Sequence, residues 1–144
     1  MKITDILKQK KVTVSCELFP PKAGTALEDA KKVVRQMAEI GPAFMSVTYG
    51  AGGGNSENTV SIADEIQNVN GITALAHLTC VNSDRQKIES VLAELRQKGI
   101  ENVLALRGDI VEGGKLGTYQ HASQLAQEIC AKEGFCVGGA CYPE

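Results

Sequence analysis

The sequence is poor in the features that mark nucleic-acid-binding, membrane and secreted proteins. Its formal net charge is −2 at pH 7, so it lacks the positive charge with which proteins bind nucleic acids. No apolar run reaches the length of about 20 residues that a membrane-spanning helix needs, and the first residues lack the apolar core of a secretory signal. We therefore expect a cytoplasmic protein that binds neither nucleic acid nor a membrane.

The cysteines lack the pattern of a disulfide framework or a metal site. The five cysteines are odd in number and form no C-x-x-C pair, a spacing common in zinc and redox sites. Disulfides are rare in the cytosol, where a free cysteine behaves as a small apolar side chain. We expect reduced thiols and no bound metal.

The sequence does contain a repeating strand–helix unit, which four glycines make visible. Each glycine follows an amphipathic segment and precedes an apolar run, the position at which a residue with positive φ ends a helix. The glycines recur at intervals of roughly 30 residues, the length of a strand–helix unit. They are Gly41, Gly71, Gly99 and Gly134.

The periodicity predicts five strands that alternate with four helices. The strands are expected at 11–19, 44–49, 72–80, 102–107 and 135–142, and the helices at 25–38, 57–68, 83–97 and 120–132, with Thr25 and Ser83 as N-caps. Strict alternation implies an α/β fold with a parallel sheet. That sheet is either an open doubly wound layer or part of a (β/α)8 barrel. A complete barrel needs about 250 residues, so residues 1–144, which we expect to form a single domain of four and a half βα units, could supply just over half of one.

Glu17 is a carboxylate in a segment that otherwise favours a buried strand. The segment ends at Pro20 and Pro21, which cannot donate hydrogen bonds to a sheet. A buried charge is costly unless it is paired or its pKa is raised. Two interpretations remain open from this segment alone: an acid or base at a functional site, or a structural carboxylate satisfied by a neighbouring cation or backbone N–H.

Polar residues recur where the other predicted strands end. In parallel α/β folds the active site lies at the carboxyl ends of the strands, so these residues share one rim. One such group proves nothing, but five strand ends of this kind favour a polar ligand. The groups are Glu17; Thr48 and Tyr49; His77 and Thr79; Arg107, Gly108 and Asp109; and Tyr142 and Glu144.

Structural interpretations compete for several of these groups. His77 alone is more typical of a buried histidine with satisfied hydrogen bonds than of a ligand contact. The run Arg107–Gly108–Asp109 fits either a turn with a local ion pair, worth under about 1 kcal/mol when exposed, or two charges that face a ligand. The glycine-rich run 50–54 suits a phosphate, but it lacks the P-loop and dinucleotide signatures, so a plain connecting loop explains it equally well.

Several motifs, taken in order, resemble those of the methylenetetrahydrofolate reductase family. They are CELFPP at 16–21, SVTYGA at 46–51, HLTC at 77–80, ALRGD at 105–109 and ACYPE at 140–144. The resemblance covers essentially the whole chain. It implies a (β/α)8 barrel that binds FAD at the carboxyl ends of its strands. That barrel passes a hydride from NADH or NADPH to 5,10-methylenetetrahydrofolate, giving 5-methyltetrahydrofolate in one-carbon and methionine metabolism.

The resemblance also implies roles for individual residues. Glu17 corresponds to the general acid that opens the five-membered ring of the folate to an iminium, a role that needs a carboxyl group protonated near neutral pH. Asp109 corresponds to an aspartate that stabilises the cationic iminium and tunes the flavin. The matches to flavin-contacting positions are Thr48, Tyr49, Ala51, His77, Arg107, Gly108, Asp109, Ala122 and Tyr142.

The chain departs from the family pattern at Leu18, where an aromatic residue is usual, at the glycine-rich 52–54, and in length. It stops inside the ACYPE motif, so we expect a truncated fragment that binds FAD weakly and has little reductase activity alone. The alternative is a catalytically silent half-barrel that assembles with itself or with a separately encoded second half. Two further classes are a barrel enzyme of other chemistry that binds phosphate at 50–54, and an adhesion protein that uses the tripeptide at 107–109.

Overall fold

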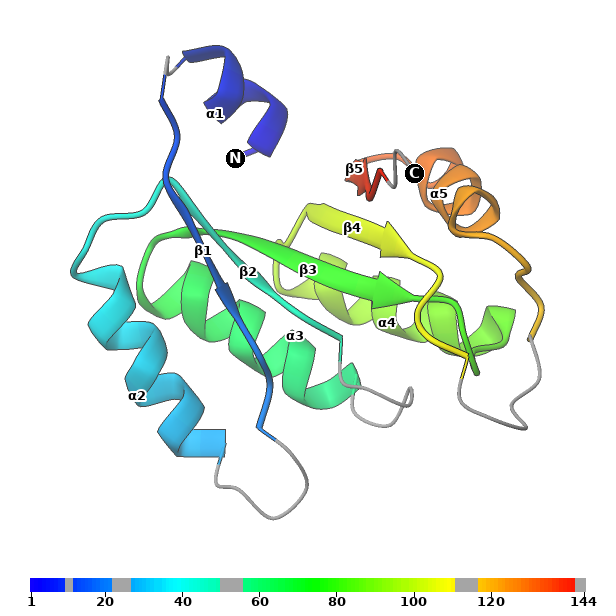
Figure 1. Cartoon of the computed structure of the whole chain (residues 1–144), viewed down its shortest axis with the longest axis horizontal. Helices are drawn as coiled ribbons and strands as arrows, with labels where there is room; N and C mark the ends of the chain where they lie inside the picture. The colour runs from blue at the N-terminus through cyan, green and yellow to red at the C-terminus, as the bar shows by residue number, and fades with distance from the viewer. Residues whose placement is uncertain (10–11, 22–26, 50–55, 111–116, 142–144) are drawn as a thin grey trace.

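The fold is one five-stranded parallel sheet in which the strands follow one another in chain order (Figure 1). It comes from a computed structural model that describes residues 1–9, 12–21, 27–49, 56–110 and 117–141. The strands are β1 (Ser15–Leu18), β2 (Phe44–Val47), β3 (Thr73–Thr79), β4 (Asn102–Leu106) and β5 (Cys136–Gly139). Each is paired in parallel with the next.

A helix connects each strand to the next, which confirms the prediction of four and a half βα units. The helices are α1 (Ile3–Gln9), α2 (Leu27–Ala38), α3 (Ser56–Asp64), the π-helical turn η1 (Glu65–Val69) that continues α3, α4 (Arg85–Gln97) and α5 (Ala122–Ala131). Figure 1 shows α2, α3 and α4 together on one side of the sheet. Within the described ranges no helix is long and apolar enough to cross a membrane.

The strand order decides between the two architectures that the sequence leaves open. A doubly wound sheet reverses its strand order at a switch point and carries helices on both faces, whereas this sheet runs β1-β2-β3-β4-β5 without a reversal. Side chains on the helix-facing side are buried: Met45, Val47, Ala74, Ala76, Leu78, Val103 and Ala105. On the opposite side, apolar residues such as Leu75, Leu104 and Leu106 are only half-buried. The sheet is therefore a segment of a (β/α)8 barrel whose inner face is open.

The helix ends follow the glycine prediction but not the predicted N-cap of α4. Gly41, Gly71, Gly99 and Gly134 have φ values of 71°, 69°, 69° and 101°, as a helix-ending glycine requires. The cap of α4 is Asp84, whose side chain accepts a hydrogen bond of 2.8 Å from the backbone N–H of Lys87. The assignment of Ser83 was wrong by one residue because both side chains suit the position. The predicted cap Thr25 lies outside the described residues.

Helix α1, which the sequence analysis did not predict, is held at the amino-terminal end of the strands by a buried asparagine. Asn102 begins β4 and is fully buried. Its Nδ2 donates to the carbonyl oxygens of Met1 (3.0 Å) and Ala74 (3.1 Å), and its Oδ1 accepts from the N–H of Ile3 (2.9 Å). One side chain thus satisfies three backbone groups from α1's start and from β3 and joins them to β4.

Replacing this asparagine tests how much α1 contributes to the fold. We expect Asn102→Ala to lower the free energy of unfolding by about 2–4 kcal/mol, because it leaves several backbone groups without a partner. Urea titration followed by circular dichroism measures the change. Gln97→Ala, at the exposed end of α4, is the control and should change the free energy of unfolding by less than about 0.5 kcal/mol. Equal stability of the two variants would show that α1 does not depend on Asn102.

Candidate active site

Three side chains meet on the open face of the sheet at Glu17. The hydroxyl of Ser46 donates to Glu17 Oε2 at 3.1 Å, and His77 Nε2 lies 3.4 Å from the same oxygen. The three residues come from β1, β2 and β3, which are neighbours in the sheet. The structure therefore joins two of the predicted site residues, Glu17 and His77, through a third that the sequence analysis did not single out.

The register of the sheet explains this meeting. Glu17 pairs with Ser46, and Ser46 pairs with Leu75. Side chains alternate along a strand, so His77 lies on the same face as Leu75 and closer to the carboxyl end. Because Ser46 is small and buried, the Glu17 side chain reaches across β2 toward β3. The sequence alone gives no signal for Ser46, because its place opposite Glu17 follows only from the register of the sheet.

His77 is held in its neutral form by burial. Its side chain is 8% exposed, whereas that of Glu17 is 48% exposed. Burial lowers the pKa of His77 below its usual value, and the Glu17 carboxylate raises this pKa by a smaller amount. At neutral pH the imidazole is therefore uncharged, so its contact with the Glu17 carboxylate is not a full ion pair.

The arrangement uses only one of the two oxygens of Glu17. Ser46 and His77 both contact Oε2, and within the described residues no group donates to Oε1. Nearly half of the Glu17 side chain is exposed, so a ligand on the open face can reach this carboxyl group. The Ser46 hydroxyl and the nearby His77 nitrogen would stabilise a negative charge on Oε2, which is what a general acid requires of its conjugate base.

Residues at the end of β2 lie on opposite faces. Thr48 shares the inner face with Ser46 and is half-buried; its carbonyl oxygen accepts from the Thr59 hydroxyl at 3.1 Å. Tyr49 is buried in the core, and this burial raises the pKa of its phenol. By alternation it points toward the helices, so a ligand at the rim would meet the backbone of Tyr49 rather than its ring.

The end of β4 presents two exposed charges around a tightly packed glycine. Arg107 and Asp109 are exposed, and Arg107 Nε donates to the carbonyl oxygen of Gly108 at 3.4 Å. Gly108 has φ +83°, and a Cβ there would lie 2.5 Å from Val81 Cγ1. In addition, the N–H of Val81 donates to the Arg107 carbonyl oxygen at 2.8 Å. Backbone contacts thus fix the place where both charges leave the sheet, while the side chains stay free for a ligand.

The remaining predicted site residues are less constrained by the structure. Ala122 is half-buried at the first position of α5. Ala51 and Tyr142 lie outside the described residues. In the described part of the chain no group of three or more His, Cys, Asp or Glu side chains has the geometry of a metal site.

Known proteins resemble this chain over nearly its whole length. Residues 2–144 match the family model for methylenetetrahydrofolate reductase. Methylenetetrahydrofolate reductase (NADH) 1 of Arabidopsis thaliana is 37% identical, over 99% of this chain and 25% of that protein. The 5,10-methylenetetrahydrofolate reductase of Pectobacterium carotovorum subsp. carotovorum is 34% identical, over 94% of this chain and 45% of its own. The chain spans less than half the length of these relatives.

A solved structure supports the fold on independent grounds. An enolase from environmental sequencing of the Sargasso Sea matches with a TM-score of 0.50 at 7% sequence identity, over 90% of this chain and 45% of that chain. At this identity the likeness concerns the fold alone.

The contact between Glu17 and His77 predicts how the histidine titrates. We expect Glu17→Gln to lower the pKa of His77 further, because the variant removes the negative charge that partly offsets burial. NMR titration of the histidine rings measures this, and His121, the other histidine of the chain, is an internal reference. An unchanged or raised pKa of His77 would contradict the contact.

The same pKa shift makes folding stability depend on pH. Since the folded pKa of His77 lies below its usual value, the unfolded chain binds this proton more readily. The contribution of His77 to stability is therefore complete above its ordinary pKa of about 6.5 and is lost as the pH falls through the lower folded value. We expect His77→Gln to flatten the decrease of the urea midpoint between neutral and mildly acidic pH. An unchanged slope would contradict the assignment.

Proposed function

Because the chain belongs to the methylenetetrahydrofolate reductase family, we propose that it forms the amino-terminal part of an FAD-dependent enzyme that reduces 5,10-methylenetetrahydrofolate to 5-methyltetrahydrofolate. NADH or NADPH would be the electron donor. Residues 1–144 would act as one domain of the barrel, in one-carbon and methionine metabolism in the cytoplasm. The observation that carries the proposal is the Glu17 carboxyl group, which contacts Ser46 and His77 through Oε2 at the carboxyl end of β1 while nearly half of its side chain is exposed.

Glu17 would act as the general acid that opens the folate ring. The carboxyl O–H bond breaks, and an N–H bond forms on the ring nitrogen that leaves the bridging carbon. The remaining ring nitrogen becomes part of the cationic iminium. The Ser46 hydroxyl already donates to Oε2 and His77 Nε2 lies beside it, so these groups would stabilise the resulting carboxylate without reorganising. Asp109, exposed at the end of β4, would place a negative charge near the iminium.

The open face also suits a flavin, which when bound supplies the hydride transfer. A flavin ring has an apolar edge and a polar, hydrogen-bonding edge. The inner face offers half-buried Leu75 and Leu104 beside buried His77, with the exposed guanidinium of Arg107 at the rim. Thr48, His77, Arg107 and Gly108 would hold the cofactor from the described part of the chain, with Ala122 from α5. Ala51 and Tyr142 stay predictions.

The uncovered inner face favours a second arrangement beside the catalytic one. An exposed sheet face and unpaired strand edges invite association, and β1 and β5 are the edges of this sheet. The chain would then be a catalytically silent half-barrel that pairs with itself or with a separately encoded second half. In this arrangement the contacts at Glu17 serve assembly of the barrel rather than turnover by the chain alone.

Complementation separates the two arrangements. We expect the chain alone to bind FAD weakly and to reduce little folate, because only part of the rim is present. Co-expression with the remaining barrel strands of the Arabidopsis relative should tighten FAD binding at least about tenfold, as a preformed site avoids ordering costs. Fluorescence titration of FAD and an assay of 5-methyltetrahydrofolate formation measure both quantities. A chain that stays yellow through dialysis and turns over alone would contradict the fragment proposal.

Variants of the assembled protein test the role of Glu17. We expect Glu17→Gln to lower kcat for folate reduction at least about 100-fold, the usual contribution of a general acid. Ser46→Ala should lower kcat about tenfold, because one hydrogen bond to a charged oxygen is lost. Reduction of the flavin by NADH, measured by its absorbance, needs no proton from Glu17 and is the control. Loss of flavin reduction together with folate reduction would show that Glu17 acts structurally.

A further inference from the structure

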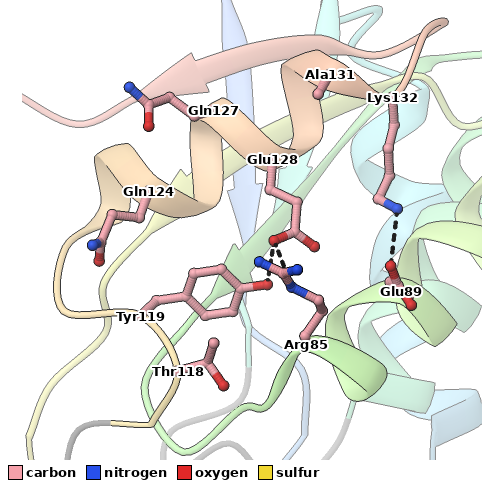
Figure 2. A pocket seen from close by; sticks show the side chains of 9 residues that line it. All are labelled: Arg85, Glu89, Thr118, Tyr119, Gln124, Gln127, Glu128, Ala131 and Lys132. Carbon is pink, nitrogen blue, oxygen red and sulfur yellow. Dashed lines mark hydrogen bonds and ion pairs between the residues drawn. The ribbon is translucent and has the colours of Figure 1, made fainter.

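A pocket of about 640 Å³ lies between the amino-terminal part of α4 and α5 (Figure 2), and Glu17 is not among the residues that line it. Two ion pairs cross it between the same two helices. Arg85 Nε lies 3.3 Å from Glu128 Oε2, and Lys132 Nζ lies 3.2 Å from Glu89 Oε1. The two pairs differ in what else they touch, and this difference identifies the role of the first.

Glu128 also holds the segment that leads into α5. The hydroxyl of Tyr119 donates to Glu128 Oε2 at 2.8 Å, and Figure 2 shows the side chains of Tyr119 and Arg85 converging on this carboxylate from opposite elements. Tyr119 is buried, and the Glu128 side chain is 15% exposed. The other oxygen, Oε1, is buried and has no hydrogen-bond partner among the described residues. The carboxylate therefore depends on these two donors.

The loop that joins β3 to α4 contacts the loop that joins β4 to α5 at two places, one near β4 and one near α5. At the first end, the N–H of Val81 donates to the Arg107 carbonyl oxygen at 2.8 Å. At the second end, the chain passes so close to Ser83 that a Cβ on Gly117 would lie 2.8 Å from its carbonyl oxygen. Arg85, two residues beyond Ser83, then reaches Glu128. Residues 81–85 thus contact the chain both at Arg107–Gly108 and at Gly117, the described residues before and after 111–116.

We propose that Arg85, Glu128 and Tyr119 form a clamp that fixes the backbone at 117–122, where α5 begins. This backbone would thereby be positioned for the ligand of the active site. The inference deepens the proposed function, on which its cofactor-binding consequence rests. The clamp residues are positioning residues: they act through the backbone at 117–122, which includes the predicted flavin contact Ala122. Glu89 and Lys132 join the same helices, but among the described residues neither forms a hydrogen bond or ion pair with 117–122.

The chemistry of the clamp keeps it closed over a wide range of pH. Burial, followed by the hydrogen bond to Glu128, raises the pKa of Tyr119 to about 12. The phenol therefore remains a donor under all ordinary conditions. Arg85 is charged at any such pH, so both donors to Glu128 persist together.

Hydrogen exchange tests the clamp in the chain as it exists. We compare Tyr119→Phe, which keeps the ring and removes the hydroxyl, with Glu128→Gln, which keeps an acceptor but removes the charge that attracts Arg85. Amides in 117–122 should exchange about tenfold faster in Tyr119→Phe, because one hydrogen bond no longer opposes local opening. Glu128→Gln should show a smaller increase. Glu89→Gln breaks the parallel ion pair between the same helices and should leave these amides unchanged.

FAD titration of the complemented barrel then tests the positioning role. Tyr119→Phe should weaken FAD binding at least about threefold, because the loosened segment must then be ordered when FAD binds, with kcat at saturating FAD unchanged. Unchanged exchange at 117–122, or equal acceleration by Glu89→Gln, would overturn the clamp. Faster exchange with unchanged FAD affinity would overturn its role in positioning. If the unsubstituted protein binds no FAD, the proposed function fails, and the exchange result alone decides the clamp.

Discussion

The register of the parallel sheet is the constraint on which the candidate site depends. Glu17, Ser46 and His77 are far apart in the sequence, and they meet because β1, β2 and β3 pair in order with Glu17 opposite Ser46. A shift of one residue between β1 and β2 would turn Glu17 toward the helices and bring Leu18 to the open face. The helix-facing side opposes such a shift, because Leu18, Met45 and Val47 fill a buried core there. Apolar packing on one face thus fixes the polar chemistry on the other.

Glu17 and His77 lie on the same open face of the sheet but differ in how far they are buried. Nearly half of the Glu17 side chain is exposed, whereas His77 beside it is buried. Burial lowers the pKa of His77, so the histidine is neutral at neutral pH. A charged histidine would instead form an ion pair with the Glu17 carboxylate. Burial of His77 therefore leaves Glu17 beside a neutral neighbour rather than a fixed positive charge.

The sequence predicted the repeating architecture and the rim better than it predicted side-chain directions. The glycines that end four helices and the apolar strands were correct because both follow from local rules of φ and burial. Glu17 and His77 could be placed on one rim because parallel strands end together. Ser46 and Asn102 were missed, since their importance lies in partners on other strands. The burial of the Tyr49 ring in the core was missed because adjacent residues of a strand point to opposite faces. The capping residue Asp84 was missed because it follows the equally suitable Ser83 by one residue.

Both ends of the rim after β4 are held by backbone or buried polar contacts rather than by apolar packing alone. Gly108 fits against Val81 only because it has no side chain, which leaves Arg107 and Asp109 on either side exposed. At the other end a buried carboxylate, Glu128, holds Tyr119 and Arg85. Such contacts are directional, unlike apolar packing, so they set the position of a segment as well as its stability. Directional contacts therefore fix where the rim residues lie relative to a polar ligand, while apolar packing against the helices stabilises the sheet.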